Sequence, residues 1–188
     1  CRAVHPPSLV RAEQRLFGRY GRTFEPAHKR EIMGSSGERA GALLAGWLDQ
    51  PGRDRELMDE VVELVHDEIA DGVDVRPGAR ELLTALKEAE TPTGLASNSS
   101  RKFIDEVLAL SGIGPLLDTT VSAREAGASK PAPDVYFEAA RRLGANPARC
   151  VALEDSPVGI TAAKEAGMFV IGIPSIEGMT LAPPADCE

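Results

Sequence analysis

Apolar residues in the first third of the chain recur with the spacing of a helix. Each such segment places its apolar side chains three or four positions apart, which is typical of an amphipathic helix. The three segments are residues 9–21, 39–48 and 55–69. In the last of them, the residues predicted to share one face are Leu57, Val61, Val62 and Val65. Because no strand-like run interrupts this region, the pattern predicts an all-helical insert over residues 8–73.

The pattern changes after residues 71–78, where glycine, proline and aspartate interrupt the helical spacing. Downstream, short apolar runs alternate with helical segments of roughly ten residues, which indicates right-handed strand–helix–strand units and a parallel sheet. The four predicted strands are at residues 91–97, 118–123, 150–154 and 168–174. The predicted fold is therefore α/β, with a Rossmann-like parallel sheet core over 74–188, plus residues 1–7, that carries the helical insert.

Composition narrows the class of protein and of partner. The 188 residues are 43% hydrophobic and 27% charged, which is ordinary for a soluble globular protein. The net charge of −8, without a basic patch, argues against nucleic acid as a partner. No apolar run reaches the roughly 18 residues of a membrane span, and no signal peptide opens the chain. The three cysteines have no metal-like spacing, which favours a reducing, cytoplasmic setting.

Ligands of parallel α/β sheets bind beyond the carboxyl ends of the strands, so the residues that follow each predicted strand are candidate site residues. The first such segment is Ser97, Asn98, Ser99 and Ser100, ahead of a predicted helix. Hydroxyl groups and backbone N–H groups at a helix N-terminus suit a phosphate. A serine there is also a common N-cap, and the segment taken alone favours that simpler interpretation.

The second segment places Lys130 before Pro131. Proline favours an extended conformation in the residue before it, which would hold the lysine stem away from the helix that begins near Pro133. A solvated lysine in a proline-rich turn explains the same residues equally well.

The third segment places two adjacent carboxylates, Glu154 and Asp155, at the end of a buried strand. Ser156 is a natural N-cap, Pro157 suits the first helical position, and Gly167 ends the predicted helix. Adjacent carboxylates repel each other, and a bound Mg²⁺, which takes one or two carboxylates in addition to water and phosphate, would remove that repulsion. The alternative is a favourable interaction of the two carboxylates with a helix N-terminus.

The order of the three segments carries more information than any one of them. Phosphate donors, a compact positive charge and a metal site follow three successive strands, and these are the parts that phosphoryl transfer requires. The combination therefore favours a functional interpretation over three unrelated structural ones.

The same residues carry a resemblance to a known family. The segments LASNS, SKPAP and LEDSPVGITAAKEAG resemble the second, third and fourth motifs of the haloacid dehalogenase superfamily, in the branch with a helical cap that contains β-phosphoglucomutase and many small phosphatases. This resemblance implies that residues 8–73 are the cap domain. It also implies that Ser97 and the Asn98 backbone hold phosphate, that Lys130 bridges phosphate and nucleophile, and that Glu154 and Asp155 hold Mg²⁺.

The chain departs from the family pattern in one respect. The first motif, D-x-D-G-[TV], supplies the aspartate nucleophile and an acid/base aspartate, and no D-x-D occurs in the 188 residues. The opening segment resembles the sequence that normally follows this motif, so we expect the first strand and both aspartates just before Cys1. The end, LAPPADCE, lies where the family continues with a further strand and helix. The resemblance thus implies a core without its first strand and its C-terminal end.

The resemblance leaves several reactions open. The favoured one is Mg²⁺-dependent hydrolysis of a small phosphorylated metabolite through an aspartyl-phosphate. A sugar phosphomutase would place an arginine after G-x-S in the cap, where this chain has Gly37, with Arg39 two positions late. A non-catalytic phosphometabolite-binding protein without the first motif is a third hypothesis, and the acidic pair argues against a metal-free dehalogenase.

Substrate selection is expected to involve the cap. Ser35, Ser36 and Arg39 are predicted to face the substrate. The segments LASNSSR and IGIPS resemble plant flavin mononucleotide phosphatases of this family, but a sugar, a nucleotide or a flavin phosphate all stay open, as does the oligomeric state.

Overall fold

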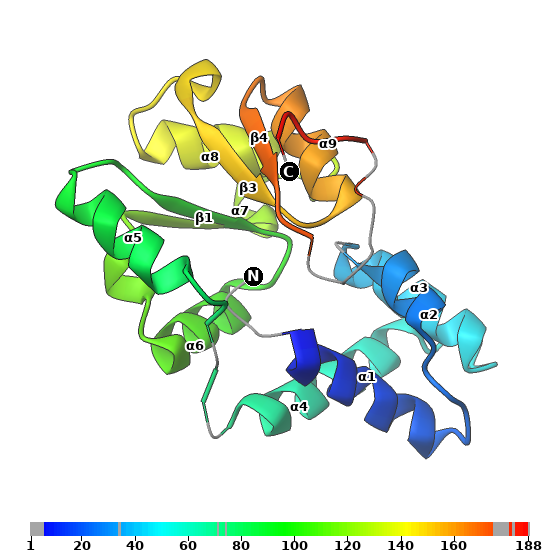
Figure 1. The fold of residues 1–188 in the computed structure, drawn as a ribbon. Coiled ribbons are helices and arrows are strands. Elements are labelled where there is room, and N and C mark those ends of the chain that lie inside the picture. The colour runs from blue at the N-terminus through cyan, green and yellow to red at the C-terminus, as the bar shows by residue number, and fades with distance from the viewer. Residues whose placement is uncertain are drawn as a thin grey trace.

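The computed structural model describes residues 6–33, 35–70, 72–73, 75–174, 181 and 183–187 (Figure 1). The chain begins with helices only, as the apolar spacing predicts. These are α1 (Pro6–Arg19), α2 (Pro26–Ile32), α3 (Gly37–Trp47) and α4 (Asp54–Ile69). Within the described residues, no helix is both long enough and apolar enough to cross a membrane.

Strands and helices alternate in the rest of the chain, which confirms the predicted α/β class. The elements in order are α5 (Ala79–Glu88), β1 (Gly94–Ser97), α6 (Arg101–Ser111), the 3₁₀ turn η1 (Gly114–Leu116), β2 (Thr119–Ser122), α7 (Ala123–Ala126), α8 (Asp134–Arg142), the 3₁₀ turn η2 (Pro147–Arg149), β3 (Val151–Glu154), α9 (Pro157–Glu165) and β4 (Phe169–Gly172). All four strands lie where the sequence predicts them. The predicted domain boundary near residue 73 stays a prediction, and Asp71 and Asp74 of that hinge lie outside the described residues.

The described strands form two parallel pairs rather than one continuous sheet. Strand β1 pairs with β2 in the register Ala96 to Val121, and β3 pairs with β4 in the register Ala152 to Val170. Helix α8 contacts β1, β2 and α9, while α9 contacts β3 and β4, so one layer of helices covers the same side of both pairs. The apolar cluster beneath these helices joins Val121 to Ala152 and Ile160. The two pairs therefore share one core.

The helical N-terminal region packs against α6 of the α/β core. Its buried residues, among them Leu16, Leu44 and Leu64, form one apolar cluster with Ile104 and Val107 of α6. The buried face of α4 differs from the predicted one, because Val62 is exposed. The buried residues of α4 are Leu57, Val61, Leu64, Val65 and Ile69. The prediction for Val62 was wrong because a helix turns by about 100° per residue, which carries Val62 away from its neighbour Val61.

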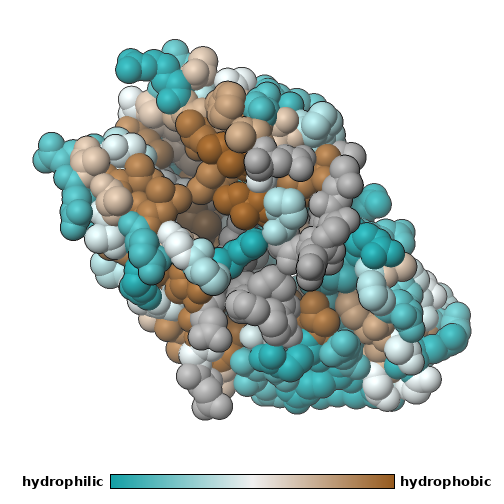
Figure 2. All heavy atoms as spheres, in the orientation of Figure 1, coloured by the Kyte–Doolittle hydropathy of each residue, from teal (hydrophilic) through white to brown (hydrophobic). Residues whose placement is uncertain are grey.

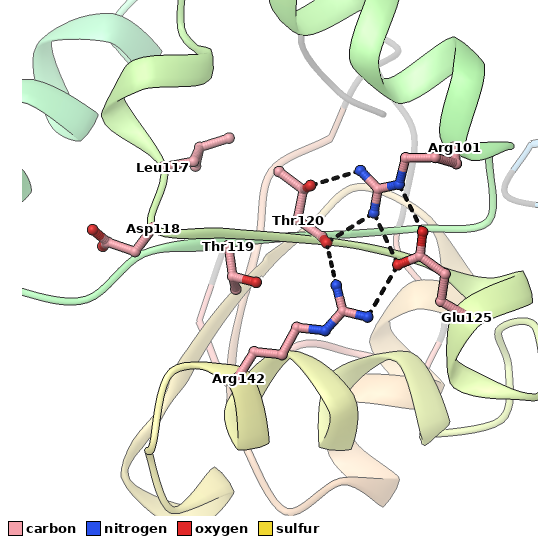
Figure 3. A pocket seen from close by; sticks show the side chains of 7 residues that line it. All are labelled: Arg101, Leu117, Asp118, Thr119, Thr120, Glu125 and Arg142. Atoms are coloured by element: carbon pink, nitrogen blue, oxygen red, sulfur yellow. Dashed lines mark hydrogen bonds and ion pairs between the residues drawn. The ribbon is translucent and has the colours of Figure 1, made fainter.

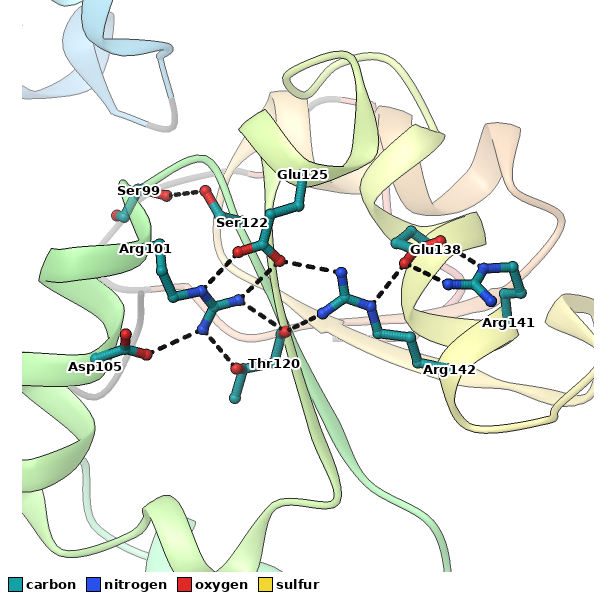
Figure 4. Close-up of polar contacts among 9 residues, drawn as sticks. All are labelled: Ser99, Arg101, Asp105, Thr120, Ser122, Glu125, Glu138, Arg141 and Arg142. Carbon is teal, nitrogen blue, oxygen red and sulfur yellow. Dashed lines mark hydrogen bonds and ion pairs between the residues drawn. The ribbon is translucent and has the colours of Figure 1, made fainter.

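Side chains close the outer edge of β2. The Thr120 carbonyl accepts hydrogen bonds from Arg101 Nη2 and Arg142 Nη1, both at 2.9 Å (Figure 3). Both guanidinium groups also bind Glu125, and the hydrogen bond from Arg101 is the main reason why the pKa of Glu125 falls to about 2 (Figure 4). An edge strand covered in this way is protected from pairing with another chain.

The outer edge of β4 is covered by the end of the chain. The Gly172 N–H donates to the Cys187 carbonyl at 2.7 Å, and the Asp186 N–H donates to the Val170 carbonyl at 2.8 Å. Within the described residues, by contrast, no strand pairs with the inner edges of β1 and β3, which lie next to each other (Figure 1). The outer edges are thus covered, while no described strand covers the inner ones.

Apolar side chains surround these inner edges. Val151 and Leu153 of β3 are 59% and 41% exposed, and Phe169 of β4 is 51% exposed. Figure 2 shows apolar atoms gathered around a hollow over the strands and α5. Successive side chains of a strand point to opposite faces of the sheet, and these exposed residues share the outer face. Ala152 and Val170, which point to the other face, are buried. One face of the β3–β4 pair is therefore apolar and only partly covered.

Candidate functional site

Lys130 joins the carboxyl ends of β1 and β3. Its Nζ atom donates to the Ala96 carbonyl of β1 at 3.1 Å and to Glu154 Oε1 of β3 at 2.6 Å. The loop before α8 holds this lysine, whose bond to Pro131 is cis. Two of the three segments that the sequence singles out therefore meet through one ammonium group.

The remaining segment, residues 97–100, fixes the backbone of Lys130 through Asn98. The Asn98 side chain accepts a hydrogen bond from the Lys130 N–H at 2.8 Å and donates one to the Lys130 carbonyl at 3.3 Å. This paired contact, made across 32 positions in sequence, needs both the carbonyl and the NH₂ group of an amide side chain. Asn98 thus has a structural role besides the phosphate contact predicted for its backbone.

The positive charge beside Glu154 comes from Lys130. The side chains of Lys130 and Glu154 are only 9% and 4% exposed, so their 2.6 Å ion pair is almost fully removed from water. A buried carboxylate without a partner is strongly unfavourable, so this pairing stabilises the folded protein. We predicted that Mg²⁺ offsets the charge of both carboxylates, but for Glu154 the lysine already does so.

Two further contacts hold the Glu154 carboxylate. Ser156 Oγ donates to Glu154 Oε2 at 3.3 Å and, as the N-cap of α9, accepts from the Gly159 N–H at 3.2 Å. Gly159 lies in the first turn of α9, directly beneath the carboxylate, where a Cβ atom would overlap it. The predicted cap residues of α9 are therefore confirmed, and Gly159 is a further site residue that the sequence analysis did not identify.

Replacing Gly159 by alanine is expected to destabilise the protein, although the same change in most helices stabilises by about 1 kcal/mol. The added methyl group has to displace the Glu154 carboxylate from Lys130 and Ser156. Gly46 of α3 is the matched control, because a Cβ atom there meets nothing within 4 Å. Urea unfolding of both variants checks the prediction, and an increase in stability for both would contradict it.

The serines of residues 97–100 have different structural roles. Ser100 is the N-cap of α6 and accepts from the Phe103 N–H at 3.3 Å, which confirms the simpler interpretation for that residue. Ser97, at the end of β1, is 2% exposed and its Oγ atom accepts from the Ser99 N–H at 3.1 Å. Ser97 therefore lies at the same sheet end as Lys130, and its contact with phosphate stays a prediction.

The three residues of the predicted cap domain that are expected to face the substrate, Ser35, Ser36 and Arg39, lie at the start of α3. Ser36 is the N-cap of this helix, and its Oγ atom accepts from the Arg39 N–H at 3.3 Å. Ser35 donates its N–H to the Ile32 carbonyl at 3.1 Å, and Arg39 is exposed. These contacts explain the residues locally, and their role toward a substrate stays a prediction.

Glu154 and Asp155 are not equally suited to bind a divalent cation. Asp155 is half-buried directly after β3, and such an oxygen ligand suits Mg²⁺, which takes one or two carboxylates and keeps several waters. Glu154 Oε1, in contrast, already accepts from both Lys130 and Tyr136. Within the described residues, no three His, Cys, Asp or Glu side chains are grouped closely enough to hold a metal ion. Asp155 thus fits as a direct ligand and Glu154 as a charge behind it.

A cavity of about 600 Å³ lies elsewhere, beside the outer edge of β2. Its charged lining is formed by Arg101, Asp118, Glu125 and Arg142 (Figure 3). Both arginines there already bind Glu125 and the Thr120 carbonyl. This cavity therefore belongs to the covered sheet edge, and the residues predicted from the sequence do not line it.

Comparison with known proteins identifies the family of this chain. The haloacid dehalogenase-like hydrolase family matches residues 12–167. The chain is 32% identical over 163 residues to a bifunctional riboflavin kinase/FMN phosphatase of Arabidopsis thaliana, which covers 86% of this chain and 43% of that protein. It is 35% identical over 123 residues to hexitol phosphatase B of Escherichia coli K12, and this match covers 65% of this chain and 55% of that protein. The chain thus spans about half the length of these curated relatives.

Solved structures show the same fold. CbbY from Rhodobacter sphaeroides, in complex with xylulose-(1,5)bisphosphate, has a TM-score of 0.78 at 25% identity, covering 97% of this chain and 86% of that one. A β-phosphoglucomutase from Clostridium difficile has a TM-score of 0.77 at 24% identity, covering 88% and 77%, which speaks for the fold alone. Because the family match extends over most of the residues, and includes all three segments of the site, the chain belongs to the haloacid dehalogenase-like hydrolases.

Proposed function

We propose that the full-length protein is a Mg²⁺-dependent hydrolase of a small phosphorylated metabolite. The observation that carries this proposal is the meeting of Lys130, Glu154 and Asn98 at the carboxyl ends of β1 and β3, with Ser97 and Asp155 beside them. A phosphoryl group needs fixed positive charge and hydrogen-bond donors, and these residues supply both. The relatives named FMN phosphatase and hexitol phosphatase support the same reaction class.

The roles follow from position. Ser97 Oγ and the Asn98 N–H are assigned to two phosphate oxygens, and Lys130 is assigned to a third, where it balances the charge that develops during transfer. Asp155 would hold the cation, with Glu154 behind it. When bound, Mg²⁺ draws electron density from the phosphoryl oxygens.

We assign the nucleophile to a further strand between β1 and β3. Within the described residues, no strand pairs with the inner edges of β1 and β3, and Val151 and Leu153 of β3 are exposed, which suits a parallel strand with apolar residues on both faces. Such a strand would deliver the aspartates of a D-x-D-G-[TV] motif beside Lys130. One carboxylate oxygen attacks phosphorus as the ester P–O bond breaks, and the second aspartate of the motif, in its protonated form, gives its proton to the oxygen of the leaving alcohol. That aspartate, now a carboxylate, takes a proton back from the attacking water in the next step. Water then cleaves the aspartyl-phosphate to inorganic phosphate and the restored carboxylate.

A phosphomutase uses the same first step, and the chain is 37% identical over 102 residues to β-phosphoglucomutase of Bacillus subtilis, covering 53% of this chain and 43% of that protein. Gly37 stands where the resemblance predicts the arginine that grips a second phosphate, which favours hydrolysis. A screen of phosphate esters against the full-length protein, with and without Mg²⁺, tests the proposal. Free phosphate supports hydrolysis, transfer between two positions of a sugar supports the mutase, and binding without turnover supports a non-catalytic protein.

The 188-residue chain produced on its own is expected to be inactive, to bind Mg²⁺ weakly and to aggregate. Without the proposed strand, no aspartate attacks phosphorus, and the inner edges of β1 and β3, with which no described strand pairs, stay open to pairing with other chains. Extension through an upstream D-x-D-G-[TV] segment should restore all three properties. Phosphate release, light scattering and thermal melting of both proteins provide the comparison. Metal-dependent turnover by the short chain would show that another residue is the nucleophile.

A further inference from the structure

The Tyr136 hydroxyl contacts both partners of the Lys130–Glu154 ion pair. It accepts a hydrogen bond from Lys130 Nζ at 3.1 Å and donates one to Glu154 Oε1. The tyrosine lies on α8, is 7% exposed, and has its ring centroid 4.6 Å from Lys130 Nζ. Because water has little access to this site, the loss of the hydroxyl would not be made good by solvent. Its position is thus coupled to that of both charges.

Within the described residues, three acceptors surround Lys130 Nζ, which is as many as an ammonium group has N–H bonds. The three acceptors are the Ala96 carbonyl, the Tyr136 hydroxyl and Glu154 Oε1. A phosphate oxygen can therefore bind Lys130 only when one of these acceptors is exchanged for it. If the exchanged contact is the one to Glu154, the donors that remain have to hold that carboxylate in place, since a buried charge that loses a partner is strongly unfavourable.

We propose that Tyr136 is the positioning residue that makes this exchange possible. Its O–H bond to Glu154 Oε1 does not involve Lys130, so the carboxylate stays in place while the ammonium turns toward the phosphate. Phenylalanine at this position keeps the ring but removes the O–H donor from Glu154 Oε1. The inference rests on the proposed function only in taking phosphate as the ligand of Lys130.

The chain contains a matched control, because its second tyrosine has the same kind of contacts. Tyr20 OH accepts from Arg53 Nη1 at 3.1 Å and donates to Glu60 Oε1 at 2.9 Å. These residues lie in the helical N-terminal region, away from the ends of β1 and β3. Tyr20→Phe therefore removes one hydroxyl between a cation and a carboxylate without touching the candidate site.

The experiment compares Tyr136→Phe, Tyr20→Phe and the unmodified full-length protein, at a temperature at which circular dichroism shows all three folded. Calorimetry measures the Kd for inorganic phosphate, and steady-state kinetics separates kcat from KM. We expect Tyr136→Phe to weaken phosphate binding and to raise KM by roughly tenfold, the scale of losing one hydrogen bond to a charged group. We expect Tyr20→Phe to change neither.

The outcomes separate the inference from the proposed function. Equal phosphate affinity in Tyr136→Phe and the unmodified protein, or equal weakening in both variants, overturns the role of Tyr136. An unmodified protein that hydrolyses no phosphate ester overturns the proposed function instead, while its phosphate Kd still tests the tyrosine. A double variant with Glu154→Gln adds a second test. The effect of Tyr136→Phe on phosphate affinity should shrink there, because glutamine carries no charge to be held, and a fully additive effect contradicts the inference.

Discussion

Replacement of Lys130 by alanine is expected to lower the turnover of the full-length protein by roughly a hundredfold or more, the usual effect of removing one electrostatic stabiliser from an active site. The lysine is buried, and it lies between the ends of β1 and β3 through contacts with Ala96 and Glu154. In such surroundings its charge acts on a bound phosphoryl group with little screening by water. Phosphate release under saturating substrate measures the loss.

A second buried lysine–glutamate pair provides the control for this prediction. Lys29 Nζ lies 2.8 Å from Glu13 Oε1, with side chains 15% and 6% exposed, in the helical N-terminal region. Burial raises the pKa of Glu13 while Lys29 opposes this rise, so the control lysine also supports a buried carboxylate. Lys29→Met should lower stability about as much as Lys130→Met but leave kcat intact. Near-normal turnover of Lys130→Met would show that Lys130 has a structural role only.

The elements that the sequence predicts well are those with local signals. Helix α9 has an N-cap serine, a proline in its first turn and a glycine with a φ of 78° after its end, and all three are visible in the sequence. Helix α2 was not predicted, because its seven residues contain no buried side chain and no apolar period. A capping box between Glu25 and His28 and the contact of Lys29 with Glu13 hold it instead.

The candidate site shows the same division. The three segments were found because each follows a strand, and strand ends meet in a parallel sheet. The pairing of Lys130 with Glu154 spans 24 positions and that of Tyr136 with Glu154 spans 18, so no local pattern indicates them. The ring of Tyr136 lies in the core among apolar side chains, and only its hydroxyl reaches the ion pair.

Replacement of Asp155 by alanine is expected to abolish Mg²⁺-dependent turnover. Asp155 supplies a half-buried negative charge directly after β3, beside the ion pair of Glu154 with Lys130. A hard divalent cation needs that charge, and within the described residues no other carboxylate is grouped with this pair to replace it. Glu154→Gln should reduce activity less, because glutamine can still accept from Lys130 and Tyr136.

Asp118 provides the control for Asp155. It precedes β2, at the opposite end of the strand pair, and its Oδ2 atom accepts from the Thr93 N–H at 2.8 Å. Asp118→Ala should lower the melting temperature and leave the Mg²⁺ dependence unchanged. Mg²⁺ titration by calorimetry, together with phosphate release over a range of Mg²⁺ concentrations, distinguishes the two variants. Because the cation would contact both Asp155 and the phosphate, the loss in Asp155→Ala should appear both in Mg²⁺ affinity and in kcat. Full activity of Asp155→Ala would remove the metal from this end of β3 and leave Lys130 as the main source of positive charge.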